Sequence, residues 1–149
     1  PSPIFTVDSP FSLDIDSDQN DFYQYPGETN LTSIRILNNG QEDGWENLSL
    51  SFNNNIDNAT VSIVVDFINL SSESQIINET SDNFKQYVFY DSETNSTFLN
   101  LSSGDSANLT LTISTLENSI FEDSSFVLSI KSRTEDVYSS TFYLYNRDN

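Results

Sequence analysis

Apolar and polar residues alternate from Ser33 to Phe67, and this alternation limits the possible folds more than any other feature of the sequence. A side-chain period of two is what a β-strand needs when one face is buried and the other is wet. Turn-forming residues at 38–40 and 43–44 divide the first two runs, as turns with positive φ do. We therefore predict three consecutive antiparallel strands here, with Trp45 entering the second. The apolar members are Ile34, Ile36, Leu48, Leu50, Phe52, Val61, Ile63, Val65 and Phe67.

The same period continues to the end of the chain, and no segment has a convincing helical pattern. Strands are predicted at about 31–37, 46–53, 60–68, 86–90, 97–101, 107–113, 125–131 and 137–145. The segment 69–84 reads as a loop with a short strand at 75–78. Short strands at regular spacing are typical of a sandwich. We predict an all-β fold, an immunoglobulin-like antiparallel β-sandwich of about eight or nine strands, formed by residues 17–149 as one domain.

Residues 1–16 form an extended N-terminal segment in this prediction, because their three prolines oppose a helix. The segment is more apolar than an ordinary tail. It is either the first strand of the chain's own sheet or a donor segment that completes the sheet of a neighbouring copy. The apolar residues of this candidate donor segment are Ile4, Phe5, Val7, Phe11, Leu13 and Ile15.

Composition excludes several classes of function. The formal net charge is −18, from 23 acidic and five basic residues, which argues against binding to nucleic acid or to an anionic membrane surface. The chain has no Cys and no His, so thiol chemistry, structural zinc sites and the usual general base are absent. We expect no catalytic residues, no enzymatic activity and no cofactor. No apolar run is long enough for a transmembrane helix.

Eight Asn-X-Ser/Thr sequons are present, where this composition gives roughly four or five by chance. Alternation directs the Leu of three of them inward and the flanking pair outward. The interpretation is N-linked glycosylation at the surface, and therefore secretion of the protein to the cell exterior. Removal of a signal peptide is the simplest account of a chain that begins with Pro1. The candidate glycosylation sites are Asn30, Asn47, Asn58, Asn69, Asn78, Asn95, Asn100 and Asn108.

An acidic run, D-I-D-S-D-Q-N-D, follows the N-terminal segment. Several carboxylates close together suit Ca²⁺, which prefers hard oxygen ligands. The run departs from an EF-hand loop, which needs Gly where Gln19 stands and Glu where Tyr25 stands. A solvated acidic loop explains it without a metal. If a cation binds, Asp16, Asp18 and Asp21 are its ligands in this interpretation.

The last predicted strand carries aromatic residues on both faces. Phe142 and Leu144 share the face predicted to be buried, so Tyr143 and Tyr145 lie on the other. A thick aromatic core explains this pattern, with hydroxyls that reach water. The alternatives are a contact of Tyr143 and Tyr145 with another subunit, or a surface that stacks on carbohydrate.

Four motifs together resemble a known family. They are I-x-I-x-N-N-G at 34–40, N-L-S-L at 47–50, L-x-x-G-D-S at 101–106 and L-x-L-x-I at 109–113. Across about 31–145 the chain resembles the immunoglobulin-like domains of archaeal and bacterial cell-surface proteins, of the cell-adhesion-related (CARDB) type or associated with S-layers. The resemblance implies a structural or adhesive extracellular role and brings no catalytic residues. The acidic stretch and the 69–84 segment depart from the pattern.

Two functional hypotheses follow. In the first, the chain is a structural subunit of a glycosylated extracellular filament, such as a pilus, or of a surface layer. Its partners are copies of itself, joined through the N-terminal donor segment. In the second, it is an adhesion or binding module of a larger surface protein, with Ca²⁺ dependence as a variant. An N-terminal segment that folds back on its own domain favours the second.

Overall fold

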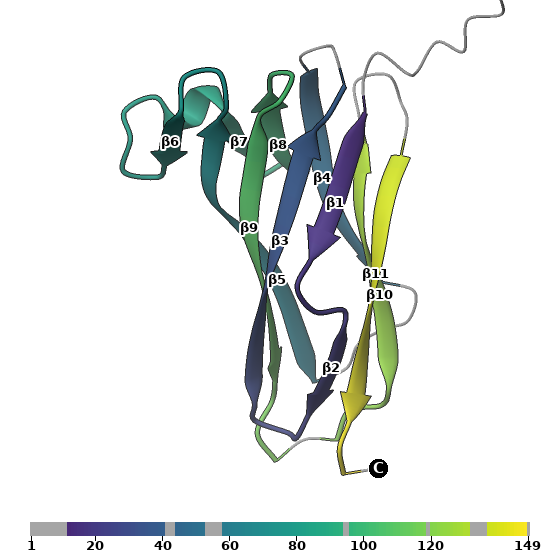
Figure 1. Cartoon of the computed structure of the whole chain (residues 1–149). Coiled ribbons are helices and arrows are strands. Elements are labelled where there is room, and N and C mark those ends of the chain that lie inside the picture. Colours follow the sequence, from purple (N-terminus) through teal and green to yellow (C-terminus); the bar gives the residue numbers. More distant parts are fainter. Residues whose placement is uncertain are drawn as a thin grey trace, which may run out of the picture.

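The computed structural model describes residues 12–40, 44–52, 58–93, 96–118, 120–131 and 137–148, without the side chains of 44–52, 96 and 137. Nearly all of it is strand, arranged as two packed sheets (Figure 1). The elements are β1 Leu13–Ser17, β2 Asp21–Gln24, β3 Thr29–Asn38, β4 Gly44–Phe52, β5 Ala59–Leu70, β6 Gln75–Asn78, the 3₁₀ helix η1 Phe84–Gln86, β7 Val88–Asp91, β8 Ser96–Leu101, β9 Ser106–Thr115, β10 Ser124–Lys131 and β11 Val137–Asn146.

The first sheet has the strand order β1-β3-β9-β5-β6, and the second has the order β2-β11-β10-β4-β8-β7. All neighbours are antiparallel except β2 and β11, which are parallel. This confirms the predicted antiparallel sandwich, with eleven strands among the described residues. The prediction at 33–67 is right about the strands and wrong that they are neighbours. β3 and β5 lie on either side of β9, and β4 belongs to the opposite sheet.

The core lies between the sheets and is made by the apolar residues of the alternating pattern. In β9, the central strand of the first sheet, Leu109, Leu111 and Ile113 are fully buried. From the second sheet, Phe126 stacks on Phe142 with ring centroids 5.3 Å apart. Such aromatic pairs add about 0.5–1.5 kcal/mol to the effect of burial itself. The period of two thus separates one dry face from one wet face on each sheet.

A buried asparagine ties the two sheets together at one end. Asn38, the last residue of β3, donates from Nδ2 to the carbonyl of Leu101 in the second sheet. Its Oδ1 accepts from Gly40 N–H, so an Asx turn forms at the predicted turn. The positive φ predicted at 38–40 is not found at these described residues. Nearby, the carboxylate of buried Asp105 accepts from the N–H groups of Ser71 and Ser102. These bonds satisfy buried polar groups that would otherwise be costly.

The chain changes sheets between β1 and β2. β1 lies beside the end of β3 that finishes at Asn38, and the chain then crosses so that β2 lies beside β11. Asp18 N–H donates to Ser33 O before the crossing, and Asn20 holds the other side by donating from Nδ2 to Thr141 O at 2.9 Å. The sequence alternation around Phe22 did not reveal this change of partner.

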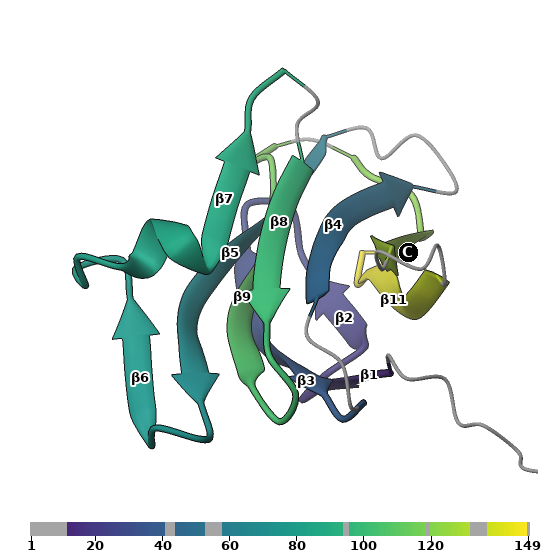
Figure 2. The ribbon, with the colours of Figure 1, turned by 90° about the horizontal axis from the view of Figure 1, so that it is seen from above.

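The connection predicted as a loop at 69–84 contains β6 at the predicted position and runs into η1, which was not predicted. Seen from above, β6, η1 and β7 close the side of the sandwich opposite to β1 (Figure 2). η1 occupies Gln86, where a strand was predicted, so β7 begins at Val88. No helix within the described residues is long and apolar enough to cross a membrane.

Replacing Leu111 by Ala tests where the core lies. Leu111 is fully buried at the centre of the first sheet, so the change should lower the free energy of unfolding by about 2–5 kcal/mol. Thr112→Ala on the outer face of the same strand is the control, and should change it by less than about 0.5 kcal/mol. Urea unfolding followed by circular dichroism measures both. Equal losses in the two variants would contradict the assigned inner face.

Candidate functional sites

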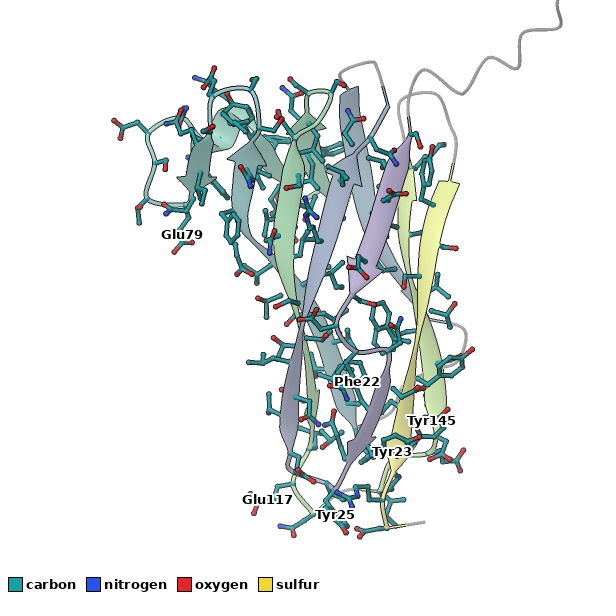
Figure 3. All side chains as sticks on the ribbon, in the orientation of Figure 1. Phe22, Tyr23, Tyr25, Glu79, Glu117 and Tyr145 are labelled. Carbon is teal, nitrogen blue, oxygen red and sulfur yellow. The ribbon has the colours of Figure 1, made fainter. Side chains whose placement is uncertain are left out.

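Three tyrosines form a stack on the outer face of the second sheet, here called the tyrosine ladder: Tyr23 of β2 with Tyr143 and Tyr145 of β11. Tyr23 lies directly opposite Tyr145 in the parallel register, and their ring centroids are 4.8 Å apart with 17° between the planes. Tyr145 and Tyr143 are 6.3 Å apart, also at 17°. Figure 3 shows Tyr23 and Tyr145 side by side, with Phe22 directed inward.

The ladder continues to the end of the sandwich that carries the C-terminus. There the guanidinium of Arg147 lies 5.0 Å above the ring of Tyr25, within the range of a cation–π interaction. Partial burial and then the carboxylate of Asp21 raise the pKa of Tyr145 above its ordinary value of 10.0. Tyr145 therefore keeps its phenolic proton at neutral pH and remains a hydrogen-bond donor at the surface.

The stacking also decides what the ladder can do. The ring of Tyr145 is flanked by Tyr23 and Tyr143, so its faces are turned to its neighbours. A sugar that stacks on an aromatic residue needs a free ring face. Tyr145 therefore serves to fasten β2 to β11, whereas Tyr23 and Tyr143 at the ends of the ladder are 58% and 43% exposed. The ladder brings together the two predicted interface residues, Tyr143 and Tyr145, with Tyr23, which the sequence analysis missed.

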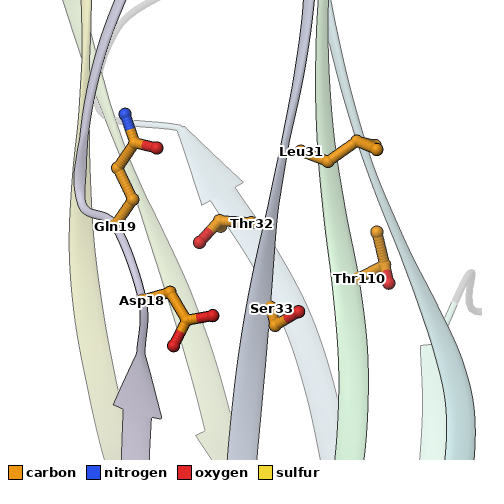
Figure 4. Close-up of a pocket in the computed structure, with 6 residues that line it drawn as sticks. All are labelled: Asp18, Gln19, Leu31, Thr32, Ser33 and Thr110. Carbon is orange, nitrogen blue, oxygen red and sulfur yellow. The ribbon is translucent and has the colours of Figure 1, made fainter.

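A second feature lies where the chain leaves the first sheet. β1 pairs only with residues 34–38 of β3, so no described strand lies beside Thr29–Ser33 on that side. A hollow of about 290 Å³ occupies this place, here called the notch (Figure 4). Its lining residues are Asp18, Gln19, Leu31, Thr32, Ser33 and Thr110.

The notch has an apolar and an unsatisfied polar component. Leu31 is 62% exposed on the outer face, as are several other large apolar side chains of the described strands, such as Val64 and Ile76. Thr32 points the other way and is 5% exposed, and its Oγ1 has no hydrogen-bond partner within the described part of the chain. A buried hydroxyl that makes no hydrogen bond costs free energy.

The predicted cation ligands are not brought together. Asp16 is exposed in β1 opposite Arg35 of β3, Asp18 lines the notch, and Asp21 begins β2 in the other sheet. Among the described residues, no group of three or more Asp or Glu is placed to hold a metal ion. The structure thus does not bring the three predicted ligands together, and cation binding at them stays a prediction. The change of sheets between β1 and β2 separates carboxylates that lie close together in the sequence.

The candidate donor segment is divided by the structure. Leu13 and Ile15 belong to β1 and pair with Asn38 and Ile36 of the same chain. Leu13 is 4% exposed and is part of the core. These two residues therefore serve as a first strand in this structure. Ile4, Phe5, Val7 and Phe11 lie outside the described residues.

The sequons fall on several strands and turns. Alternation places Asn100 and Asn108 outward, because Leu101 and Leu109 beside them are fully buried, as predicted. Asn69 and Asn78 are exposed, and Asn78 Oδ1 accepts from Thr80 N–H within its own sequon.

Of the remaining sequons, Asn30 is partly buried, Asn58 is exposed with its amide hydrogen-bonded, and two have no described side chain. Asn30 faces inward, opposite Ile113, at the start of β3. Asn58 adopts a positive φ of 63° and donates from Nδ2 to Ile120 O at 2.7 Å. Asn47 lies in β4, where only the backbone is described, and Asn95 lies outside the described residues.

Comparison with known proteins identifies the fold. No protein-family model matches the sequence. No curated protein sequence matches it either. Three solved structures resemble it at TM-scores just above 0.5. The fold is an immunoglobulin-like β-sandwich.

The first of these is the major pilin subunit BcpA of Bacillus cereus (TM-score 0.52, 8% identity, 91% of this chain and 40% of that one). The second is a family 123 glycoside hydrolase from Clostridium perfringens (0.54, 12%, 89% and 27%). The third is a chain of the CaDoc0917(R16D)–CaCohA2 complex (0.51, 12%, 91% and 99%). The chain thus spans less than half the length of the first two. At these identities the likeness concerns the fold alone.

Replacing Tyr145 by Ala tests the ladder. The change removes two ring contacts that fasten the four-residue strand β2, so the free energy of unfolding should fall by about 1–3 kcal/mol. Tyr145→Phe keeps the ring and should change it by less than about 0.5 kcal/mol. Both are measured by urea unfolding. If the Phe variant loses as much as the Ala variant, the hydroxyl and not the stack holds β2.

Glycopeptide mass spectrometry on protein from a glycosylating host tests the sequons. We expect glycans on Asn69 and Asn78, which are exposed, and none on Asn30, whose side chain faces the interior. Asn69→Gln should remove one glycan mass from the intact protein, whereas Asn30→Gln should remove nothing. A glycan on Asn30 would contradict the inward direction of its side chain at the start of β3.

Proposed function

We propose that this chain is a structural subunit of a glycosylated extracellular filament, of pilus type, or of a surface layer. Subunits join by donating the apolar N-terminal segment of one copy to the sandwich of the next. The subunit is secreted, acts outside the cell, has no enzymatic activity and needs no cofactor or metal. Its partners are copies of itself, with N-linked glycans on its surface.

The feature that carries this proposal is a spare apolar segment before β1. Leu13 and Ile15 of β1 already close the described core beside residues 34–38 of β3. Ile4, Phe5 and Val7 come before β1 and add a short β-prone run that the described core does not need. A strand that completes another copy's sheet buries such a run and pairs its backbone. Head-to-tail donation does not close on itself, so it yields a fibre.

The surface and composition support a role outside the cell. A charge of −18 keeps subunits apart unless a specific contact joins them. The eight sequons suit a glycan-covered exterior. The absence of His and Cys leaves no usual general base or thiol nucleophile, which supports a non-catalytic role.

A second candidate function is an adhesion or binding module of a larger surface protein. The pairing of β1 with β3 favours it, because part of the N-terminal segment folds back on its own domain. The tyrosine ladder would then be the contact surface. Its exposed rings, such as Tyr23 at 58%, are of the kind enriched in protein interfaces.

Removing residues 1–11 distinguishes the two functions, because this deletion leaves β1 intact. If the segment is a donor strand, the full-length protein forms fibres and the truncated protein stays dispersed in negative-stain electron microscopy. The truncated chain should keep its thermal midpoint, since Leu13 and Ile15 remain in place. A full-length chain with Ile4→Ser, Phe5→Ser and Val7→Ser is the matched control, and it should also stay dispersed.

Fibres that persist in both variants would exclude strand donation. If the unaltered full-length protein also gives only dispersed particles, the adhesion module is favoured. The tyrosine ladder would then be the surface to test.

A further inference from the structure

We infer that the notch, at residues Thr29–Thr32 of β3, is the site that accepts residues 3–11 of the next copy as an added strand. This inference rests on the proposed strand donation and names its acceptor. Within the described residues, β3 loses its neighbour on one side over this stretch. β5 does so over residues 59–66, beyond the reach of β6, and β11 over residues 137–142, beyond β2.

The backbone of β3 offers hydrogen bonds at the notch. In an antiparallel ladder, alternate residues direct both N–H and C=O to the same neighbour. Ser33 O accepts from Asp18 on the β1 side, so Leu31, two residues earlier, directs its N–H and C=O to that same side. β9 holds the other side of β3 over nine residue pairs, from Thr29 to Leu37. The open edge is therefore a rigid template for one more strand.

The direction of an incoming strand also fits. β1 runs antiparallel to β3, and its first residue, Leu13, lies opposite Asn38. Leu13 therefore lies at the end of the sandwich opposite to Thr29 (Figure 1). In a head-to-tail stack the segment before Leu13 meets the Thr29 end of the next copy. It would run antiparallel to that copy's β3, in line with that copy's own β1, and so extend the edge strand from five residues towards the full length of β3.

The reach is sufficient. Twelve residues precede β1, and an extended chain spans at most about 3.3–3.6 Å per residue, or roughly 40 Å. Pairing with Thr29–Thr32 uses only four residues of it, or about 14 Å. The remainder crosses the junction between copies.

The side chains of the donor match the notch. Phe5 and Val7 share one face of an extended strand, and Ile4 and Thr6 share the other. With Phe5 and Val7 directed inward, one of them covers the hollow beside Thr32. Ile4 then lies on the outer face with Leu31, whose exposed side chain gains an apolar neighbour. The edge strands β2, β6 and β7 have four residues each, and the stretch of β5 at 59–66 is the other long open template in the first sheet.

Disulfide trapping tests the site directly, because the chain has no cysteine of its own. The full-length variant with Thr6→Cys and Leu31→Cys is assembled and oxidised. If the notch is the acceptor, it gives a ladder of covalent multimers on non-reducing gels, and reductant collapses the ladder to monomer. Ile4→Cys with Leu31→Cys covers the neighbouring register on the same strand face.

Two matched pairs place the cysteine elsewhere. Thr6→Cys with Val64→Cys puts it on the outer face of β5, 56% exposed, in the stretch 59–66 that β6 does not cover. This pair tests the other open stretch of the same sheet and should give no ladder; a ladder here and not with Leu31→Cys would overturn the notch. Thr6→Cys with Phe89→Cys puts it on β7, the far edge of the second sheet, and should also give none.

The outcomes separate this inference from the proposed function. A ladder with Leu31→Cys supports the notch. A ladder with Phe89→Cys alone, or fibres that cross-link with neither register at Leu31, overturns the notch while strand donation stands. If the unaltered protein forms no fibres and no pair cross-links, both the notch and the proposed function fail.

Discussion

The change of sheets between β1 and β2 is the constraint on which the rest of the structure depends. A chain that stayed in the first sheet would cover β3 along its whole length. This chain leaves β3 after Ser17 because Phe22 is buried in the second sheet, 6.4 Å from the ring of Phe142. Asn20 fixes the crossing: it accepts from Ser17 Oγ, and its carbonyl accepts from Tyr143 N–H. The crossing produces both candidate sites.

On one side of the crossing, few interactions hold β2 against the second sheet. Its parallel pairing with β11 covers only four residues. Phe22 holds it from inside, and the tyrosine ladder holds it from outside. On the other side, the crossing leaves Leu31 exposed and Thr32 buried without a partner. The same change of sheets therefore produces two features. The tyrosine ladder has its ring contacts within the chain, whereas the edge of β3 at Thr29–Thr32 has no neighbouring strand among the described residues.

The alternation of apolar residues was enough to predict the sandwich and most of the strands. Runs such as Leu109-x-Leu111-x-Ile113 have a dry face whatever their neighbours are, so the period reveals them. The period does not reveal pairing, and β4 was therefore assigned to the wrong neighbours. η1 was also missed, because Phe84 is followed by polar and aromatic residues that equally suit a strand.

The sites were predicted in part. Tyr143 and Tyr145 were found because they are out of phase with Phe142 and Leu144. Tyr23 and Tyr25 have the same spacing of two, which marks one strand face but does not identify Tyr145 and Arg147 as their partners. Asp16, Asp18 and Asp21 are close in the sequence but do not form a cluster in the structure, because the chain changes sheets between Asp16 and Asp21. The notch was not predictable, since it depends on where β1 ends relative to β3.

Amide hydrogen exchange at Leu31 tests the central claim most directly. In the dispersed protein without residues 1–11, the amide of Leu31 should exchange rapidly, whereas that of Thr32, directed towards β9, should be protected. In assembled full-length protein, the Leu31 amide should slow by at least about 100-fold, as expected when a strand pairs with it. A Leu31 amide already protected in the dispersed chain, or still unprotected in the fibre, would contradict the account.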